Sequence, residues 1–285
     1  MIAIKLEGRL GNQMFQYAFI YTAAKKIGTS FYIDKSIENF VLPQYFEVKN
    51  NYLSILDNRV FSINGFKNIF RVHARKAFYH FISKIIFKER TENIETEAKP
   101  AYILKTLKNN RLYKGFFYSA AYFEDFKDDI RALYQVREKY ATAFNCINDQ
   151  LDPSKKKVVI HVRRTDYVDL DFSLPLSYYK KAIEAVDSPD LEYIFISDDP
   201  SFIENEFGYI ANKYISSHDE IIDLQFLINA DICILSCSSF SWWGAWLNSK
   251  KDKQIYAPKY WLGFKDGKEF PAGVSDHVNF NWVQV

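Results

Sequence analysis

Two stretches of the sequence carry anion-binding side chains where an apolar, strand-like run ends. The first is VVIHVRRTDY (158–167), in which His161, Arg163, Arg164 and Asp166 lie in or just after the run. Neighbouring residues of a strand point to opposite faces, so one arginine is expected to face a ligand, where its guanidinium can grip two phosphate oxygens. The other arginine could form a structural ion pair with Asp166. A salt-bridge cluster without any ligand is the alternative.

The second stretch is SCSSFSWWGAWLN (236–248), which follows the apolar run DICILS. Hydroxyl groups and backbone N–H groups at the start of a helix make an anion site, although they can also serve only as a helix cap. Together, the two strand ends fit one phosphate-bearing ligand. Trp242 and Trp246 share a helix face and are expected to pack beneath this turn, whereas stacking of Trp243 on a sugar is an alternative role.

The turn GRLGNQ (8–13) is a third candidate, because its two glycines let the backbone approach a ligand closely. It matches neither the P-loop nor the GxGxxG fingerprint, so it gives no support to an ATPase or an NAD-dependent enzyme. Asp169-Leu170-Asp171 has the DxD form of some metal-dependent glycosyltransferases, but it lies in a polar stretch and we expect no metal there. The five histidines have no metal-ligand spacing, and nothing resembles a nucleophile elbow.

Bulk composition is that of a soluble globular protein, with 285 residues, 48% hydrophobic and 25% charged. A net charge of +2 and the lack of any nucleic-acid-binding motif argue against DNA or RNA as a partner. The three cysteines have no metal-ligand spacing, and those in the apolar run are expected to be buried free thiols. The first residues turn polar too quickly for a signal peptide, and no run of 18 apolar residues occurs. We therefore expect a cytoplasmic protein that touches a membrane only peripherally.

The elements that must position these residues alternate between strands and helices. In the first half we expect strands over 2–6, 31–34 and 112–119, and helices over about 13–27, within 61–100 and over 121–136. In the second half we expect strands over 158–162, 192–197 and 231–236. The helices there are expected over 177–186, from Asp199 with Pro200 in its first turn, over 219–230 and over 240–249. This alternation indicates parallel sheets, with ligands at the carboxyl ends of strands.

The polar stretch 148–157 reads as a linker, which predicts domains over 1–150 and 151–285. The helix expected within 61–90 is strongly basic, with Lys67, Arg71, Arg75, Lys76, Lys84, Lys88 and Arg90. A solvated basic face over an aromatic core is the favoured interpretation. Contact with anionic lipid is the alternative.

Three motifs in this order, GRLGNQMFQYA, HVRRTDY and SSFSWWGAWL, resemble the α-1,2-fucosyltransferases of glycosyltransferase family 11 in their short bacterial form. The resemblance spans nearly the whole chain, and HVRRTD, SDDP and IIDLQFLINADICILSCSS are also similar to α-1,6-fucosyltransferases. Protein O-fucosyltransferases share the GRxGNQ and HxR elements. The resemblance implies a GT-B-like α/β fold of two Rossmann-like domains with a cleft between them. It further implies GDP-fucose as donor, inversion at the anomeric carbon and no metal or other cofactor.

Carried over residue by residue, the resemblance implies a site divided between an N-terminal acceptor-side domain and a C-terminal GDP-fucose-binding domain. Arg163 would hold the β-phosphate, His161 would lie beside the nucleotide, and Asp223 would accept from guanine N1 and N2. The other donor contacts would come from Gly11, Asn12, Asp198, Ser238, Ser239, Phe240 and Ser241, with Asn12 near the fucose and the leaving group. Asp166 and His161 are the candidates for a catalytic base, and a mechanism without a strong base stays open.

These implied roles agree with the chemistry, because a metal-free transferase must neutralise a diphosphate leaving group with its own donors. A carboxylate also matches the adjacent N–H donors of guanine. Two departures from the family pattern stand out: Arg9 replaces a glycine, and Phe117-Tyr118 replaces Trp-Gln in the half expected to bind the acceptor.

We therefore expect transfer of fucose to the 2-hydroxyl of a terminal galactose on a bacterial surface glycan, such as O-antigen or capsule, or on its lipid-linked precursor. The alternatives are a transferase for another GDP-sugar or another fucose linkage, and a nucleotide-sugar-binding protein without transfer.

Overall fold

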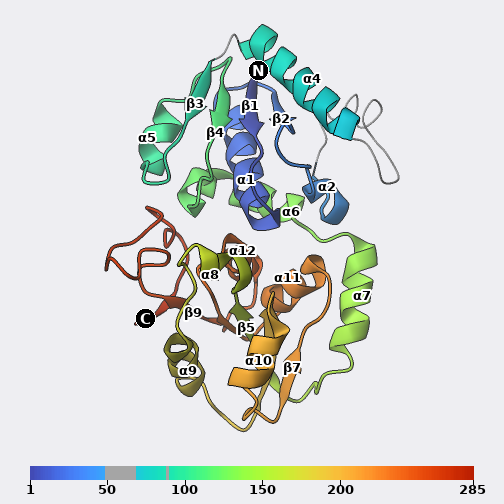
Figure 1. Ribbon diagram of the computed structural model, residues 1–285, viewed down its shortest axis with the longest axis vertical. Coiled ribbons are helices and arrows are strands. Elements are labelled where there is room, and N and C mark those ends of the chain that lie inside the picture. Colours follow the sequence, from blue (N-terminus) through green and yellow to red (C-terminus); the bar gives the residue numbers. More distant parts are fainter. Residues whose placement is uncertain (49–68, 88–89) are drawn as a thin grey trace. The chain divides into compact units, whose positions relative to one another are not determined.

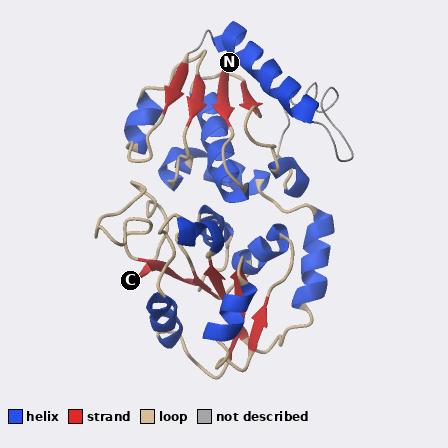
Figure 2. Ribbon diagram, in the orientation of Figure 1, coloured by secondary structure: helices blue, strands red, loops and turns tan. Residues whose placement is uncertain are grey.

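The computed structural model describes residues 1–48, 69–87 and 90–285 (Figure 1). The chain divides into two compact units, Met1–Gln135 and Val136–Val285. Both are α/β units built on parallel sheets, as the alternation of elements predicts (Figure 2). No helix among the described residues is both long enough and apolar enough to cross a bilayer.

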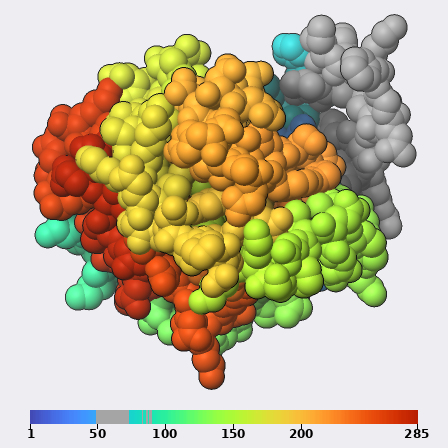
Figure 3. Space-filling model, turned by 90° about the horizontal axis from the view of Figure 1, so that it is seen from below, coloured from blue at the N-terminus to red at the C-terminus, as the bar shows by residue number. Residues whose placement is uncertain are grey.

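The observed division differs from the predicted boundary near residue 150, because helix α7 (Glu138–Asn148) belongs to the second unit. The Phe144 ring lies edge-on to Phe226, with centroids 5.1 Å apart. The Gln225 side chain donates to the Tyr140 carbonyl at 3.1 Å. Figure 3 shows the green residues of α7 beside orange residues of the same unit. The polar stretch 148–157 therefore connects α7 to the next strand within one unit.

The first unit is a four-stranded parallel sheet in the order β2-β1-β4-β3. Its strands are β1 (Ile2–Lys5), β2 (Phe31–Asp34), β3 (Thr91–Asn93) and β4 (Leu112–Lys114). Its helices are α1 (Leu10–Lys26), α2 (Leu42–Tyr45), α4 (Ile69–Phe87), α5 (Pro100–Lys105) and α6 (Lys127–Leu133), with 3₁₀ turns at Ala120–Tyr122 and Glu124–Phe126. Helix α4 packs on the sheet by burying Tyr79 and Phe87 against Ala3, Tyr32 and Leu112.

Two predicted elements of the first unit are wrong in extent. The strand predicted over 112–119 ends at Lys114, because Phe117 turns into the left-handed region (φ 58°) and its ring stacks on Phe19 at 3.7 Å. The helix predicted over 121–136 is broken at Phe123, which is fully buried and has a non-helical backbone. Burial of aromatic rings thus overrides the helical periodicity of this stretch.

The second unit is a six-stranded, wholly parallel sheet in the order β10-β9-β8-β5-β6-β7. Its strands are β5 (Lys156–Val162), β6 (Leu191–Ser197), β7 (Lys213–Ile215), β8 (Ile232–Ile234), β9 (Gln254–Pro258) and β10 (Asn281–Val283). Besides α7, its helices are α8 (Thr165–Asp169), α9 (Leu176–Glu184), α10 (Pro200–Glu206), α11 (Glu220–Ile228) and α12 (Ser239–Leu247).

Strand β5 lies between β8 and β6. Because all three strands are parallel, their carboxyl ends meet at one edge of the sheet. The segments that follow them are the three motifs HVRRTD, SDDP and SCSSFS. The predicted strands and helices of this unit are confirmed with small shifts at their ends, and Asp199 caps α10 by accepting from the Phe202 N–H at 3.1 Å.

Candidate active site

Arg163 follows β5 and is held by two carboxylates. Its Nε donates to Asp166 Oδ1 at 2.9 Å, its Nη2 lies 2.7 Å from the same oxygen, and its Nη1 lies 3.0 Å from Asp198 Oδ2. The side chain is only 17% exposed, and the guanidinium lies over the Tyr167 ring. Because its guanidinium is paired with carboxylates on two sides, the orientation of Arg163 is fixed before any ligand binds.

Arg164 has a different role from its neighbour. Its guanidinium lies 4.1 Å from the centroid of the Phe202 ring, and Nη1 donates to Ser173 Oγ at 3.1 Å. The side chains of Arg163 and Arg164 therefore have different surroundings, as the alternation of strand side chains predicts. One detail of that prediction is wrong, because Asp166 pairs with Arg163 and not with the arginine that packs into the fold.

Asp198, at the end of β6, fastens the loop that follows β5. It accepts from the Arg164 N–H at 2.8 Å and from the Thr165 hydroxyl, besides its ion pair with Arg163. Burial acts to raise the pKa of this carboxyl, but the hydrogen bonds and the charge of Arg163 outweigh it and lower the pKa below 3.8. Asp198 was predicted to contact the sugar nucleotide. Its observed contacts are those of a residue that positions Arg163.

His161 is 5% exposed near the end of β5. Its Nδ1 lies 2.7 Å from the Ser236 hydroxyl, which joins the ends of β5 and β8, and its ring centroid is 5.4 Å from that of Phe240. Burial, helped by the charge of Arg163, lowers the pKa of His161 to about 3 against an opposing effect of Asp198. The imidazole is therefore neutral at physiological pH and is a poor general base.

The segment after β8 forms a turn that opens helix α12. Ser238 caps the helix, with its hydroxyl accepting from the Phe240 N–H at 3.3 Å. Ser239 and Phe240 are half-buried, whereas Ser241 is fully buried. The Ser241 hydroxyl lies 3.2 and 3.1 Å from the carbonyls of Ser236 and Ser238. Ser241, predicted as a ligand contact, thus braces the turn from inside, whereas Ser238 and Ser239 at the start of α12 stay predicted anion contacts.

The tryptophans of α12 form the packed base of this turn. Trp242 and Trp243 are fully buried, and Trp242 stacks on Trp246 with an interplanar angle of 11°. The indole N–H of Trp242 donates to the Val274 carbonyl at 2.9 Å. Because Trp243 has no exposed surface, the alternative of sugar stacking by this residue is wrong.

Asp223 lies on α11 in a separate group with Ser216, whose hydroxyl donates to it. Burial raises the pKa of Asp223 to about 7, and the charges of Asp219 and Glu220 add to the rise against the hydrogen bond from Ser216. The carboxyl is thus close to half-ionised at neutral pH. A ligand that offers two N–H donors would favour its charged form.

In the first unit, the loop after β1 carries the remaining predicted residues. The loop is shorter than predicted, because α1 already begins at Leu10 and Gly11 lies inside the helix. Gly8 has φ 80°, and a side chain there would come within 2.2 Å of Asn12 Nδ2. Asn12 Oδ1 accepts from the Tyr118 hydroxyl at 2.9 Å. Gly8 and Tyr118 therefore set the position of the Asn12 amide.

The sequence reasoning missed several residues that support these groups. Gln13 is 2% exposed and ties the loop together by donating to the Gly8 and Asn39 carbonyls, at 3.1 and 2.8 Å. Thr165, Ser216 and Ser236 each bond to a predicted residue. Gln13, Thr165 and Ser236 stood inside the motifs GRLGNQ, HVRRTDY and SCSSFS, whereas Ser216 lay outside every quoted motif.

Among the described residues, no cluster of three or more potential metal ligands occurs, and the two aspartates of the DxD stretch have separate surroundings. Asp169 is the last residue of α8, and Asp171 forms an ion pair with Lys265. Cys233 and Cys237 are buried free thiols, as predicted, and Cys146 is exposed.

Known structures share this fold. The crystal structure of fucosyltransferase NodZ from Bradyrhizobium aligns with a TM-score of 0.55 at 15% identity, covering 85% of this chain and 92% of that chain. This likeness confirms the predicted GT-B-type fold.

The family follows from the sequence: the chain belongs to glycosyl transferase family 11, whose model matches residues 1–283. The "O-antigen biosynthesis glycosyltransferase WbnK" of Escherichia coli is 29% identical, over 90% of this chain and 93% of that protein. The "Alpha-1,2-colitosyltransferase" of Escherichia coli is 26% identical, over 100% of this chain and 99% of that protein. The predicted family is thus confirmed.

Proposed function

We propose that this protein transfers fucose from GDP-fucose to the 2-hydroxyl of a terminal galactose on a bacterial surface glycan or its precursor, with inversion and without a metal ion. The observation that carries the proposal is Arg163, held by two carboxylates at the sheet edge where β5, β6 and β8 end. A fold-level relative, the α-1,6-fucosyltransferase NodZ, has been soaked with GDP-fucose. The name of the relative WbnK assigns that protein to O-antigen biosynthesis.

The second unit supplies the groups that a nucleotide diphosphate requires. Arg163 and the first-turn amides of α12 bind the phosphates and take up the charge that develops on the departing GDP. The carboxylate of Asp223 reads two N–H donors of guanine. His161 stays neutral beside them and keeps its ring fixed through Ser236.

In the transfer step, the acceptor oxygen forms a bond to the anomeric carbon of fucose while the bond from that carbon to the β-phosphate oxygen breaks. The bonding electrons leave with GDP, and the transition state has oxocarbenium character. The acceptor proton passes to Asp166 or to the departing phosphate, because the low pKa of His161 disfavours the imidazole. Stabilisation of the leaving group by Arg163 is then the main contribution of this chain to the rate.

A second donor is favoured by one specific observation. The colitosyltransferase relative matches the whole chain. GDP-colitose is therefore the competing donor, and the same Arg163 and Asp223 contacts would hold its GDP part.

The test is incubation with GDP-fucose, GDP-colitose or GDP-mannose and a panel of galactosides, followed by linkage analysis of the product. We expect an α-1,2-linked fucoside whose yield is unchanged by EDTA. Turnover of GDP-mannose but not GDP-fucose would overturn the donor assignment. Binding of GDP with no product from any galactoside would indicate a nucleotide-sugar-binding protein instead.

Substitution of the arginine gives a sharper version of the test. Arg163→Ala should lower turnover by about 10²–10³-fold, as for other preorganised donors at a leaving group. The matched control is Arg111→Ala, which removes another ion-paired arginine, 2.7 Å from Glu92 in the first unit. The control should keep its turnover, and an active Arg163→Ala enzyme would show that the phosphate contact has been misassigned.

A further inference from the structure

Helix α4 of the first unit is basic along its whole length. Its sequence, IFRVHARKAFYHFISKIIF, contains two arginines, two lysines and two histidines, and it contains no acidic residue. Of the predicted basic residues, Lys67 and Lys88 lie outside the described residues. Lys76 and Lys84 are exposed, and Arg75 donates to the Asn39 side chain. The helix therefore presents positive charge that its own sequence does not balance.

The same helix exposes apolar surface away from the sheet. Tyr79 and Phe87 are 1% exposed in the core, whereas Phe81 and Ile85 are 60% and 56% exposed. Because residues four apart lie one above the other on a helix, Phe81 and Ile85 form one continuous apolar patch. Helix α4 therefore has two apolar surfaces, one buried against the sheet and one exposed.

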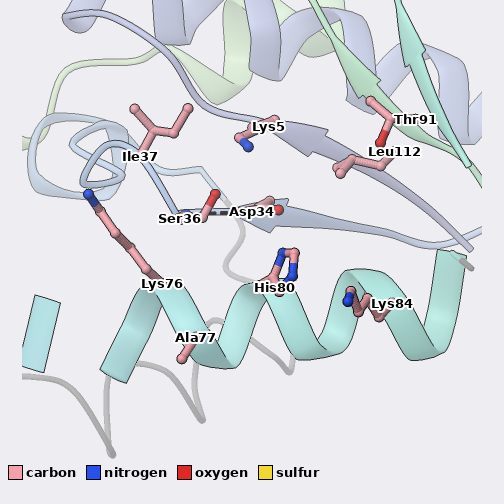
Figure 4. Close-up of a pocket in the computed structure, with 10 residues that line it drawn as sticks. All are labelled: Lys5, Asp34, Ser36, Ile37, Lys76, Ala77, His80, Lys84, Thr91 and Leu112. Carbon is pink, nitrogen blue, oxygen red and sulfur yellow. Dashed lines mark hydrogen bonds between the residues drawn. The ribbon is translucent and has the colours of Figure 1, made fainter. Parts of the chain in front are cut away.

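A cavity of about 610 Å³ lies between α4 and the sheet of the first unit. Lys76, His80 and Lys84, spaced four residues apart, line it from one side of the helix, and Lys5 and Asp34 line it from the sheet (Figure 4). The Asp34 carboxylate already accepts from the Ser36 N–H at 2.8 Å. The lysines in its lining make this cavity suited to an anion.

The row of Lys76, His80 and Lys84 lies beside the apolar patch of Phe81 and Ile85 on α4. Successive residues turn by about 100°, so the row of 77, 81 and 85 lies directly beside the row of 76, 80 and 84. Basic side chains next to exposed Phe and Ile are typical of a helix that lies in the interface of an anionic membrane.

We propose that α4 docks this protein on an anionic phospholipid surface. Phe81 and Ile85 enter the boundary between headgroups and acyl chains, and the cavity lined by Lys5, Lys76 and Lys84 receives a lipid phosphate. A second copy of the chain fits this face poorly, because a symmetric contact would oppose two acid-free basic helices. The inference is independent of the proposed activity, which concerns residues of the second unit and the Asn12 loop.

The test is co-sedimentation of the full chain with vesicles. Binding is expected with vesicles of phosphatidylglycerol mixed with phosphatidylcholine and not with pure phosphatidylcholine, and it should weaken as salt screens the charges. The Lys76→Gln/Lys84→Gln variant should bind about 25-fold more weakly, since a lysine near an anionic surface contributes about fivefold. The Phe81→Ser/Ile85→Ser variant should lose the binding that survives high salt.

The matched control is Lys180→Gln/Lys251→Gln, which removes the same charge from exposed residues of the second unit. It should bind like the wild type, and circular dichroism should show all variants folded. Three results would overturn the proposal: no binding to anionic vesicles, equal loss in the control, or a dimer that the Phe81→Ser/Ile85→Ser change dissolves. Binding of inorganic phosphate in the cavity without vesicle binding would reassign it to a soluble anion.

Discussion

Replacing Asp198 with asparagine tests whether a single carboxylate positions the Arg163 loop. Asp198 accepts from Arg163, from the Arg164 N–H and from the Thr165 hydroxyl. A hydrogen bond to a charged group contributes about 1.5–3 kcal/mol, against about 0.5–1.5 kcal/mol for a neutral one. Each of these three bonds should therefore weaken by about 1 kcal/mol. We expect the free energy of unfolding of the second unit to fall by about 3 kcal/mol in Asp198→Asn.

The effect should depend on pH in a defined direction. Because the pKa of Asp198 in the folded protein lies below 3.8, the unfolded chain binds this proton more readily than the folded one. The carboxylate contribution is therefore complete above the unfolded pKa of about 3.9 and is lost as the pH falls through the folded value. The difference between wild type and Asp198→Asn should be constant from about pH 8 to pH 6 and should shrink below about pH 4.

Urea unfolding followed by circular dichroism measures the stability, and turnover of the donor measures the positioning of Arg163. The control is Asp231→Asn, which removes a carboxylate that pairs with Lys250 at 2.6 Å and accepts from the Lys157 N–H at 2.8 Å. We expect the control to lose stability and keep turnover, and Asp198→Asn to lose both. If Asp198→Asn unfolds and turns over like the wild type, the carboxylate does not orient the guanidinium and the reasoning fails.

Three other changes probe separate features. Gly244→Ala places a Cβ 2.4 Å from Leu227 Cβ, between α11 and α12. The free energy of unfolding in urea should therefore fall by about 1–3 kcal/mol. An unchanged urea midpoint would show that the two helices can move apart at no cost. Tyr118→Phe removes the hydrogen bond to Asn12, so turnover should fall while stability changes by less than about 1.5 kcal/mol; equal turnover would deny Asn12 a positioned role. Because the pKa of Asp223 is raised to about 7, calorimetry should find GDP binding weaker at about pH 6 than at about pH 8, a dependence that Asp223→Asn should remove.

The second unit was the more predictable half of the fold. Its strands β5, β6 and β8 are largely buried and read as apolar runs, and Asp199-Pro200 marks the start of a helix. In the first unit the same reasoning failed between 112 and 136. There, Phe117 and Phe123 are drawn into the core, and aromatic packing decides the backbone, which no local periodicity records.

The candidate site shows a similar limit. The residue types of HVRRTD and SCSSFS pointed to an anion site, and the parallel strand order brings both to one edge. The partner of each side chain did not follow from sequence. Because three strands end together, Asp198 pairs with Arg163, Thr165 bonds to Asp198, and Ser236 bonds to His161. Ser241 bonds instead to carbonyls of its own loop.

The packed tryptophans of α12 have a consequence for observing the protein. All five tryptophans of the chain, Trp242, Trp243, Trp246, Trp261 and Trp282, lie in the second unit. Fluorescence excited selectively in indole therefore reports on one unit alone, whereas far-ultraviolet dichroism sums over both. Coincident transitions by the two signals would show that the units unfold as one cooperative system, and separated transitions would give each unit its own stability. The chain thus carries an intrinsic optical label on the unit that holds Arg163.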